Sequence, residues 1–232
     1  MTSEEKTYIV IDNDSCIGSW GDLSLLFALI KYYGNIPDVD YFVKLMEETV
    51  CIRPYMRNFY DKLMMLKENG KIHGIFMCTA CTNQSGWVDF LKLIIEKWYG
   101  RKIYDIVVHL EKIQEYHTEK KTPWKNDIGI IKDMKLFIDN HFCDPSGKFI
   151  VFDDLPNIYN HSKLYTVPQY NVAVNLVEVI RIQLPEFYLK CDVHYSALYK
   201  SWYDYRMFPS YFTNAEADDI FLRLCDELDS VI

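Results

Sequence analysis

Short apolar runs alternate with longer amphipathic segments along the first two thirds of this chain. Three runs are rich in β-branched and aromatic residues, and we expect buried strands at Thr7–Ile11, Ile72–Cys78 and Lys148–Phe152. A fourth run of the same character predicts a strand at Ile103–Val108. Each run is too short to form a helix of ordinary length, so strands are the natural interpretation.

Between these runs, apolar residues recur at the three- and four-residue spacing of a helix. The predicted helices are Leu23–Tyr33, Val39–Glu48, Met56–Glu68, Trp87–Tyr99 and Asp127–Asn140, the last with Asn126 as its N-cap. The polar, lysine-rich segment Glu111–Thr122 is expected to be a surface excursion. Strands that alternate with helices favour an α/β fold with a central parallel sheet flanked by helices.

The same pattern predicts the domain organisation. We expect residues 1–185 to form one core, with a small helical insert at about residues 20–50 after the first strand. Residues 186–232 are expected to form a C-terminal helical extension packed on that core.

Composition narrows the class of protein. The chain has 33 acidic and 25 basic residues and a formal net charge of −8, which argues against broad nucleic-acid binding through phosphate neutralisation. No apolar run reaches the roughly 18 residues that a membrane helix needs, and the polar start is unlike a signal peptide. We therefore expect a soluble, cytoplasmic protein without membrane partners. The sequence does not predict its oligomeric state.

Polar residues follow three of the predicted strands. Asp12 and Asp14 come after the first, Thr79 after the second, and Asp153 and Asp154 after Lys148–Phe152. The carboxyl ends of parallel strands lie along one edge of a sheet, so we expect these residues to converge. Taken singly, such residues are common in turns and caps, but their order at successive strand ends indicates a shared site. Crowded carboxylates need a cation, and hard oxygen ligands favour Mg²⁺.

This series of motifs resembles the haloacid dehalogenase superfamily, and most closely its NLI-interacting-factor-like or small C-terminal-domain phosphatases. The residues that carry the resemblance are Asp12–Ile17 (DNDSCI), Ile52–Pro54 (IRP), Cys78–Cys81 (CTAC) and Val151–Asp154 (VFDD). The similarity covers about Tyr8 to Pro168. It implies a Rossmann-like core with a small helical cap insert.

The resemblance also implies roles for individual residues. Asp12 would attack the phosphorus of a phosphomonoester, and Asp14 would act as general acid and base. Thr79 would donate a hydrogen bond to a phosphoryl oxygen. Asp12, Asp14 (through its main-chain carbonyl), Asp153 and, less directly, Asp154 would hold Mg²⁺. The expected function is a magnesium-dependent phosphomonoester hydrolase with an aspartyl-phosphate intermediate, and its substrate would be a phosphorylated small molecule or a phosphoprotein.

The family's site also needs a lysine, for which there are two candidates. Lys125 precedes the predicted helix Asp127–Asn140, where its side chain can reach the strand ends, and we favour it. Lys132 lies in a segment that echoes the family's VKDL motif. In the predicted helix, however, Lys132 falls away from the apolar stripe and is expected to be solvated.

Two other functions compete with the phosphatase. The first motif is altered at Ser15 and Cys16, and the segment Tyr195–Phe212 is rich in aromatic residues, so the chain could instead be an inactive binding protein that recognises a phosphorylated or protein partner. Simple packing of that segment on the core is the other interpretation of it. Cys78 and Cys81 have CxxC spacing, which alone is weak evidence for zinc or redox chemistry.

Overall fold

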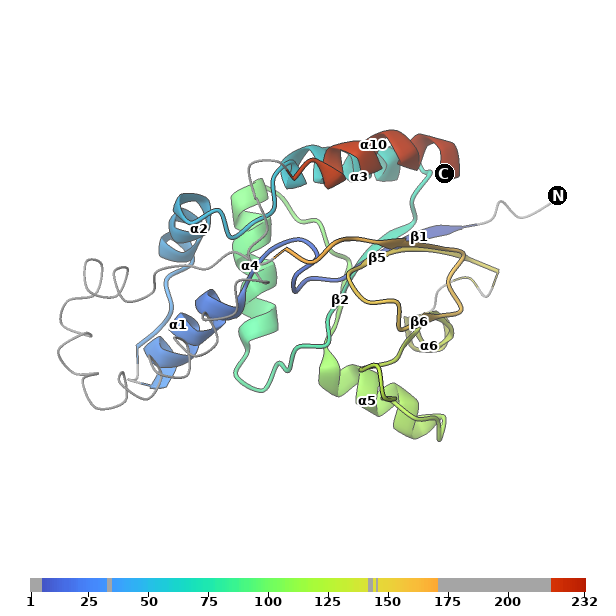
Figure 1. Ribbon diagram of the computed structural model, residues 1–232, viewed down its shortest axis with the longest axis horizontal. Helices are drawn as coiled ribbons and strands as arrows, with labels where there is room; N and C mark the ends of the chain where they lie inside the picture. The colour runs from blue at the N-terminus through green and yellow to red at the C-terminus, as the bar shows by residue number, and fades with distance from the viewer. Residues whose placement is uncertain (1–5, 33–34, 142–143, 145, 171–217) are drawn as a thin grey trace.

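A central parallel β-sheet organises the computed structural model (Figure 1), which describes residues 6–32, 35–141, 144, 146–170 and 218–232. The sheet has five strands in the order β3-β2-β1-β5-β7, and every neighbouring pair is parallel. The strands are β1 (Thr7–Ile11), β2 (Gly74–Cys78), β3 (Ile106–Val108), β5 (Lys148–Asp153) and β7 (Lys163–Thr166). The predicted α/β, Rossmann-like class is therefore confirmed.

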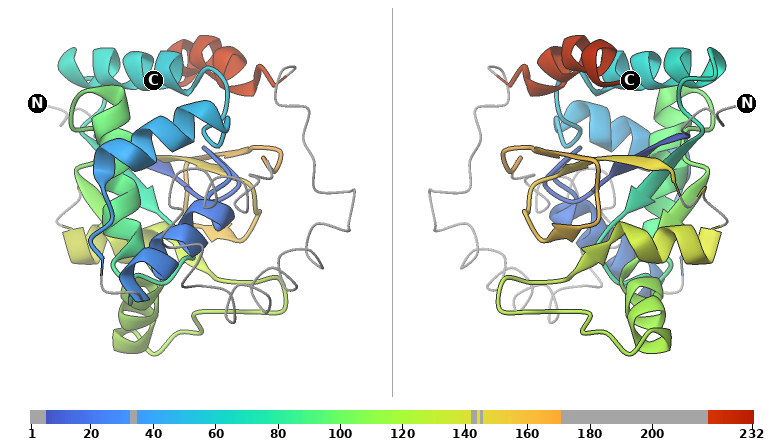
Figure 2. Two further views of the ribbon diagram at one scale, coloured as in Figure 1. Left: turned by 90° about the vertical axis from the view of Figure 1, so that its left-hand side faces the viewer. Right: turned by 90° about the vertical axis from the view of Figure 1, so that its right-hand side faces the viewer.

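Helices cover both faces of this sheet (Figures 1 and 2). One face carries α1 (Gly21–Tyr32), α2 (Val39–Glu48), α3 (Met56–Glu68), α4 (Trp87–Tyr99) and α10 (Ile220–Val231), and the other carries α5 (Leu110–Glu119) and α6 (Met134–His141). Alternate residues of β1 divide between the two cores. Ile9 and Ile11 pack with the first set of helices, whereas Tyr8 and Val10 pack with the second.

The two elements between β1 and α3 form a helical insert on the α4 side of the sheet. Phe42 of α2 lies edge-on to Phe90 of α4 with ring centroids 5.0 Å apart, and Phe27 of α1 lies 4.8 Å from the same ring. At the opposite end of the chain, α10 packs beside α3 (Figure 2), where the ring centroids of Phe59 and Phe221 are 4.7 Å apart.

Two predicted elements are wrong. The segment predicted as a helix at Asp127–Asn140 begins instead as a loop, continues as β4 (Lys132–Asp133) and becomes α6 only at Met134. The side chain of Asn126 accepts hydrogen bonds from the N–H groups of Ile128 and Gly129, and Gly129 has a φ of 148°, so the chain turns where the helix was expected to start.

The lysine-rich segment Glu111–Thr122 is the second error, because most of it forms α5. Its three buried side chains are Ile113, Tyr116 and His117, which are spaced three and four residues apart, and the first two pack in the core on this face of the sheet. Only three positions of this segment are buried and most of the others are charged or polar, so its amphipathic pattern is too weak to predict the helix.

The remaining expectations concern the C-terminal part of the chain. Residues 186–217, including Tyr195–Phe212, lie outside the described residues, whereas residues 220–231 form α10. Among the helices that the structure describes, none combines the length and the apolar character needed to cross a bilayer.

Candidate active site

Two adjacent strands bring the acidic residues together. Ile11 of β1 is in register with Phe152 of β5, and the N–H of Asp12 donates to the carbonyl of Phe152 over 2.8 Å. Asp12 and Asp153 are consequently neighbours at the same edge of the sheet, both almost fully buried. One carboxylate oxygen from each of Asp12, Asp153 and Asp154 lies within 4.8 Å of the others, the spacing of a possible metal site.

A buried lysine neutralises part of this cluster. The Nζ atom of Lys132 lies 2.6 Å from Oδ1 of Asp12 and 2.6 Å from Oδ2 of Asp153, and it also donates to the carbonyl of Cys78 over 3.3 Å. Only 5% of Lys132 is exposed, so the expectation of a solvated side chain is wrong. Lys125, which we favoured from the sequence, is exposed and lies over the ring of Trp124 at 5.0 Å, outside the cluster.

Lys132 reaches the site because of β4, a short strand that pairs in parallel with β6 (Ile158–Tyr159). The N–H of Lys132 donates to the carbonyl of Asn157, whose side-chain amide in turn donates to the carbonyl of Ile130 over 2.7 Å. Asn157 also exchanges side-chain hydrogen bonds with Asn126. This pair of asparagines fixes the loop before β4 and therefore positions Lys132.

The charges in the cluster do not balance. Burial acts to lower the pKa of Lys132, but Asp12 and Asp153 outweigh it and raise that pKa well above the ordinary value, so the lysine stays protonated. Burial raises the pKa of Asp12, and repulsion by Asp153 and Asp154 adds to this effect against the opposing influence of Lys132. One ammonium faces three carboxyl groups, which is an arrangement suited to a divalent cation.

Asp14 lies beside the cluster rather than within it. Its carboxylate is not one of the three that converge, and its Oδ2 lies 3.6 Å from the thiol of Cys81. Burial raises the pKa of Asp14, the hydrogen bond from the Cys81 thiol acts in the opposite direction, and the nearby Asp154 raises the pKa further. A raised pKa favours the protonated carboxyl group, which is the form that a general acid requires.

Thr79 lies at the end of β2, next to β1. It is fully buried, its N–H donates to the carbonyl of Val108 over 2.9 Å, and its hydroxyl accepts from the N–H of Cys81 over 3.1 Å. A hydroxyl that accepts a hydrogen bond still has its O–H to donate.

All of these groups border one cavity of about 350 Å³. Its polar lining includes the predicted residues Asp12, Asp14, Thr79, Asp153 and Asp154, together with Ser15, Cys81, Lys132 and Asn157. The strand-end prediction therefore places five residues correctly around one space, and Lys125 is the predicted site residue that the structure does not bring there.

Arg53 holds the loop that follows β1 in place through hydrogen bonds and an ion pair. The sequence motif around Arg53 did not reveal these contacts. Its guanidinium donates to the carbonyls of Cys16, over 2.9 Å, and Pro168, and Nε lies 2.8 Å from Oδ2 of Asp218. The side chain is 1% exposed. Arg53 thus joins the loop after Asp14 to two later segments of the chain, at Pro168 and Asp218.

The same loop requires a glycine at position 18. The N–H of Ser15, a residue with a φ of 60°, donates to the carbonyl of Gly18 over 2.9 Å and closes a tight turn. A Cβ atom on Gly18 would lie 2.2 Å from the Trp20 ring and 2.7 Å from the carbonyl of Cys51. A larger residue would therefore displace the turn that carries Asp14.

The cysteine pair does not resemble a zinc or redox site. Burial raises the pKa of both Cys78 and Cys81 to about 12, which disfavours the thiolate that metal binding and redox chemistry require. Within the described part of the chain, the residues grouped closely enough for a metal ion are aspartates, not cysteines.

Comparison of the chain with protein-family models, with curated proteins and with solved structures found no match.

Proposed function

We propose that this chain is a magnesium-dependent phosphomonoester hydrolase that acts through an aspartyl-phosphate. The observation that carries the proposal is the buried contact of Lys132 with both Asp12 and Asp153, in a cavity that Asp14 and Thr79 also border. A nucleophile, a general acid and donors for a phosphoryl group are thereby within one small space.

Asp12 is the proposed nucleophile. Its Oδ1 is held by Lys132, so its Oδ2 is the oxygen that would attack phosphorus and form the acyl-phosphate bond as the bond to the leaving oxygen breaks. The ammonium of Lys132 and the hydroxyl of Thr79 would stabilise the negative charge on the transferring group.

Asp14 is the proposed general acid and base. It would give its proton to the departing alcohol oxygen, and the resulting carboxylate would then deprotonate the water that attacks the phosphorus of the aspartyl-phosphate. The contact with Cys81 holds the carboxyl group of Asp14 beside the carboxylate cluster rather than within it.

The donor set fits a hard divalent cation. Carboxylate oxygens of Asp12, Asp153 and Asp154 would hold it, and their charge exceeds the single charge of Lys132. When bound, Mg²⁺ would offset the repulsion between the phosphate and the Asp12 carboxylate.

Hydrolysis of p-nitrophenyl phosphate, with Mg²⁺ and with a chelator, tests the proposal. We expect turnover that depends on Mg²⁺ and is lost in Asp12→Asn, whereas the matched control Asp139→Asn, on the surface beside Lys120, keeps it. Absence of turnover by the wild-type chain would contradict the proposal. Stable binding of a phosphate analogue without turnover would instead favour the alternative of an inactive binding protein.

A further inference from the structure

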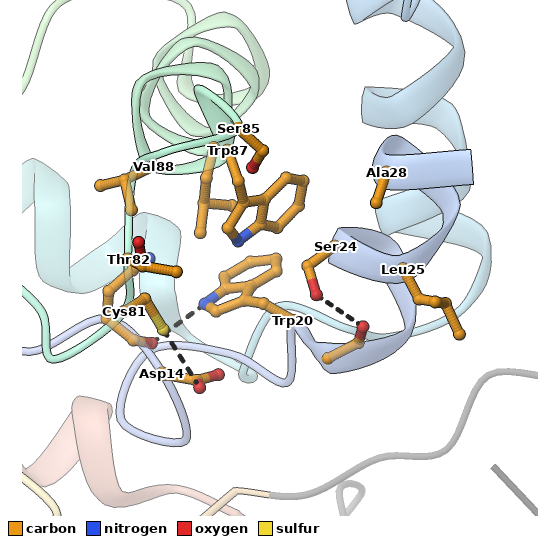
Figure 3. Close-up of a pocket in the computed structure, with 13 residues that line it drawn as sticks. Asp14, Trp20, Ser24, Leu25, Ala28, Cys81, Thr82, Ser85, Trp87 and Val88 are labelled. Atoms are coloured by element: carbon orange, nitrogen blue, oxygen red, sulfur yellow. Dashed lines mark hydrogen bonds between the residues drawn. The ribbon is translucent and has the colours of Figure 1, made fainter. Parts of the chain in front are cut away.

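A second, larger cavity of about 600 Å³ adjoins the proposed phosphate site (Figure 3). It lies between α1 and α4 and is closed by the loops that follow β1 and β2. This volume is in the range of pockets that hold small organic ligands. The apolar part of its lining comprises Trp20, Leu25, Ala28, Trp87, Val88 and Leu91.

The two cavities meet at Asp14 and Cys81, which line both of them. Figure 3 shows the carboxyl group of Asp14 and the thiol of Cys81 beneath the indole ring of Trp20. In the proposed reaction Asp14 protonates the leaving oxygen, so the alcohol part of the substrate must lie on the Asp14 side. That side opens into the second cavity.

The chemistry of the lining indicates what the cavity can hold. The indoles of Trp20 and Trp87 both line the cavity (Figure 3), and the Trp20 ring is fixed by a 3.0 Å hydrogen bond from Nε1 to the carbonyl of Asn13. Apart from Asp14, the described residues that line the cavity carry no charge. The nearby ammonium of Lys31 is not part of the lining and donates to the carbonyl of Ser85 over 2.6 Å. A second phosphate or a carboxylate on the substrate would therefore find no lysine or arginine in the lining, whereas an apolar group would be desolvated against aromatic rings.

We infer that this cavity binds the leaving group, and that the substrates are phosphomonoesters of uncharged, apolar alcohols about the size of an aromatic ring system. The inference rests on the proposed function, because Asp14 defines the side on which the alcohol lies. It also assigns the helical insert a role, since α1 supplies one wall of the cavity.

The turnover of two alkyl phosphates tests the inference. Ethyl phosphate and 3-phenylpropyl phosphate both release primary alcohols of similar acidity, so a difference in kcat/KM reports binding of the alcohol rather than the ease of bond cleavage. We expect kcat/KM to be at least about tenfold higher for the phenylpropyl ester, since apolar pockets discriminate by about 10-fold or more per group. Equal values would overturn the inference.

A charged substitution at the cavity wall makes the test specific. Ala28 is exposed on α1, so Ala28→Glu should place a carboxylate in the cavity without disturbing the core. We expect it to remove most of the advantage of the phenylpropyl ester, measured as the ratio of kcat/KM for that ester to kcat/KM for ethyl phosphate. The matched control is Leu93→Glu, at a half-exposed position of α4 outside the cavity lining, and it should keep the advantage.

Binding of phosphonates separates failure of this inference from failure of the proposed function. We would titrate 3-phenylpropylphosphonate and ethylphosphonate in the presence of Mg²⁺ and follow calorimetry and the tryptophan fluorescence of the chain, to which Trp20 and Trp87 contribute two of five residues. If neither ester is hydrolysed but the phenylpropyl phosphonate binds at least about tenfold more tightly, the result supports the leaving-group cavity and contradicts the catalytic proposal. Equal binding of the two phosphonates, or no binding of either, would overturn the inference that the second cavity binds the leaving group.

Discussion

The ammonium of Lys132 and the carboxylate of Asp12 are 120 residues apart in the chain and 2.6 Å apart in the structure, with both side chains buried. Buried charges of this kind depend on each other, because removal of one leaves the other desolvated and unpaired. The pair therefore links the stability of the fold to the chemistry proposed for its site.

Replacement of Lys132 by Met tests this link. We expect a loss of about 3–5 kcal/mol in the free energy of unfolding, because Asp12 and Asp153 lose their shared cation. We also expect kcat to fall by a factor on the order of 10²–10³, the usual effect of losing one donor to a reacting group. Urea denaturation and hydrolysis of p-nitrophenyl phosphate measure the two effects.

Lys125→Met is the matched control, since Lys125 is exposed and outside the cluster. We expect near wild-type stability and turnover. If instead Lys125→Met lost activity and Lys132→Met retained it, the assignment of the site lysine from this structure would be wrong.

The strand-end residues were predictable from the sequence because their positions depend on the sheet alone. A short apolar run predicts a parallel strand, and the end of that strand fixes the place of Asp12, Thr79 or Asp153 without knowledge of any loop. The helices α2, α3 and α4 have the predicted bounds for a similar reason, since strong amphipathic patterns decide them locally.

The position of Lys132 was not predictable in this way. It depends on β4, which is two residues long and pairs with β6 more than twenty positions later. The apolar spacing after Asn126 resembles a helix, but the side chain of Asn126 and the positive φ of Gly129 start a turn instead. The pairing of β4 with β6 and the turn at Asn126–Gly129 therefore outweigh the local helical pattern. They place Lys132, and not Lys125, in the site.

Arg53 provides a prediction about the loop that carries Asp14. Arg53→Met leaves the largely buried Asp218 without its cation and the carbonyl of Cys16 without its donor, so we expect a loss of about 3–5 kcal/mol in stability by urea denaturation. Arg53→Lys should recover only part of it, because an ammonium cannot reproduce the three contacts of a planar guanidinium. An Arg53→Met variant as stable as the wild type would contradict the role of Arg53 in holding this loop.

The loop that contributes Thr82 to the second cavity is held by Glu111, which predicts a dependence on pH. Burial acts to raise the pKa of Glu111, but hydrogen bonds from Thr82 and the Asn83 N–H outweigh it and lower that pKa to about 2. Because the pKa of Glu111 is lower in the folded than in the unfolded state, its carboxylate stabilises the fold. This stabilisation is complete above the pKa of about 4.3 in the unfolded state and is lost as the pH falls towards 2.

We therefore expect the Tm of the wild type to fall more steeply than that of Glu111→Gln between about pH 5 and pH 2.5. Differential scanning fluorimetry across this range measures the slopes. Glu119→Gln, at an exposed position of the same helix, is the control and should follow the wild type. Parallel slopes for wild type and Glu111→Gln would count against this role of Glu111.

Metal binding predicts a change in stability that does not require turnover. A ligand that binds only the folded state stabilises it by about 2.7 kcal/mol at one hundred times its Kd, so Mg²⁺ should raise the Tm of the wild type. Asp153→Asn should abolish that rise, and Asp139→Asn should not. An equal response of Asp153→Asn and wild type to Mg²⁺ would place the metal elsewhere.

The most direct test of the central claim is to trap the covalent intermediate on Asp12. Borohydride reduces an acyl-phosphate to an alcohol, so quenching the enzyme during turnover with Mg²⁺ and p-nitrophenyl phosphate should convert the aspartate at position 12 to homoserine, detectable by peptide mass spectrometry. We expect the modification at Asp12, its absence without substrate, and its absence in Asp12→Asn. Steady turnover by the wild type with no reduced residue at position 12, or with the modification at another aspartate, would contradict the mechanism.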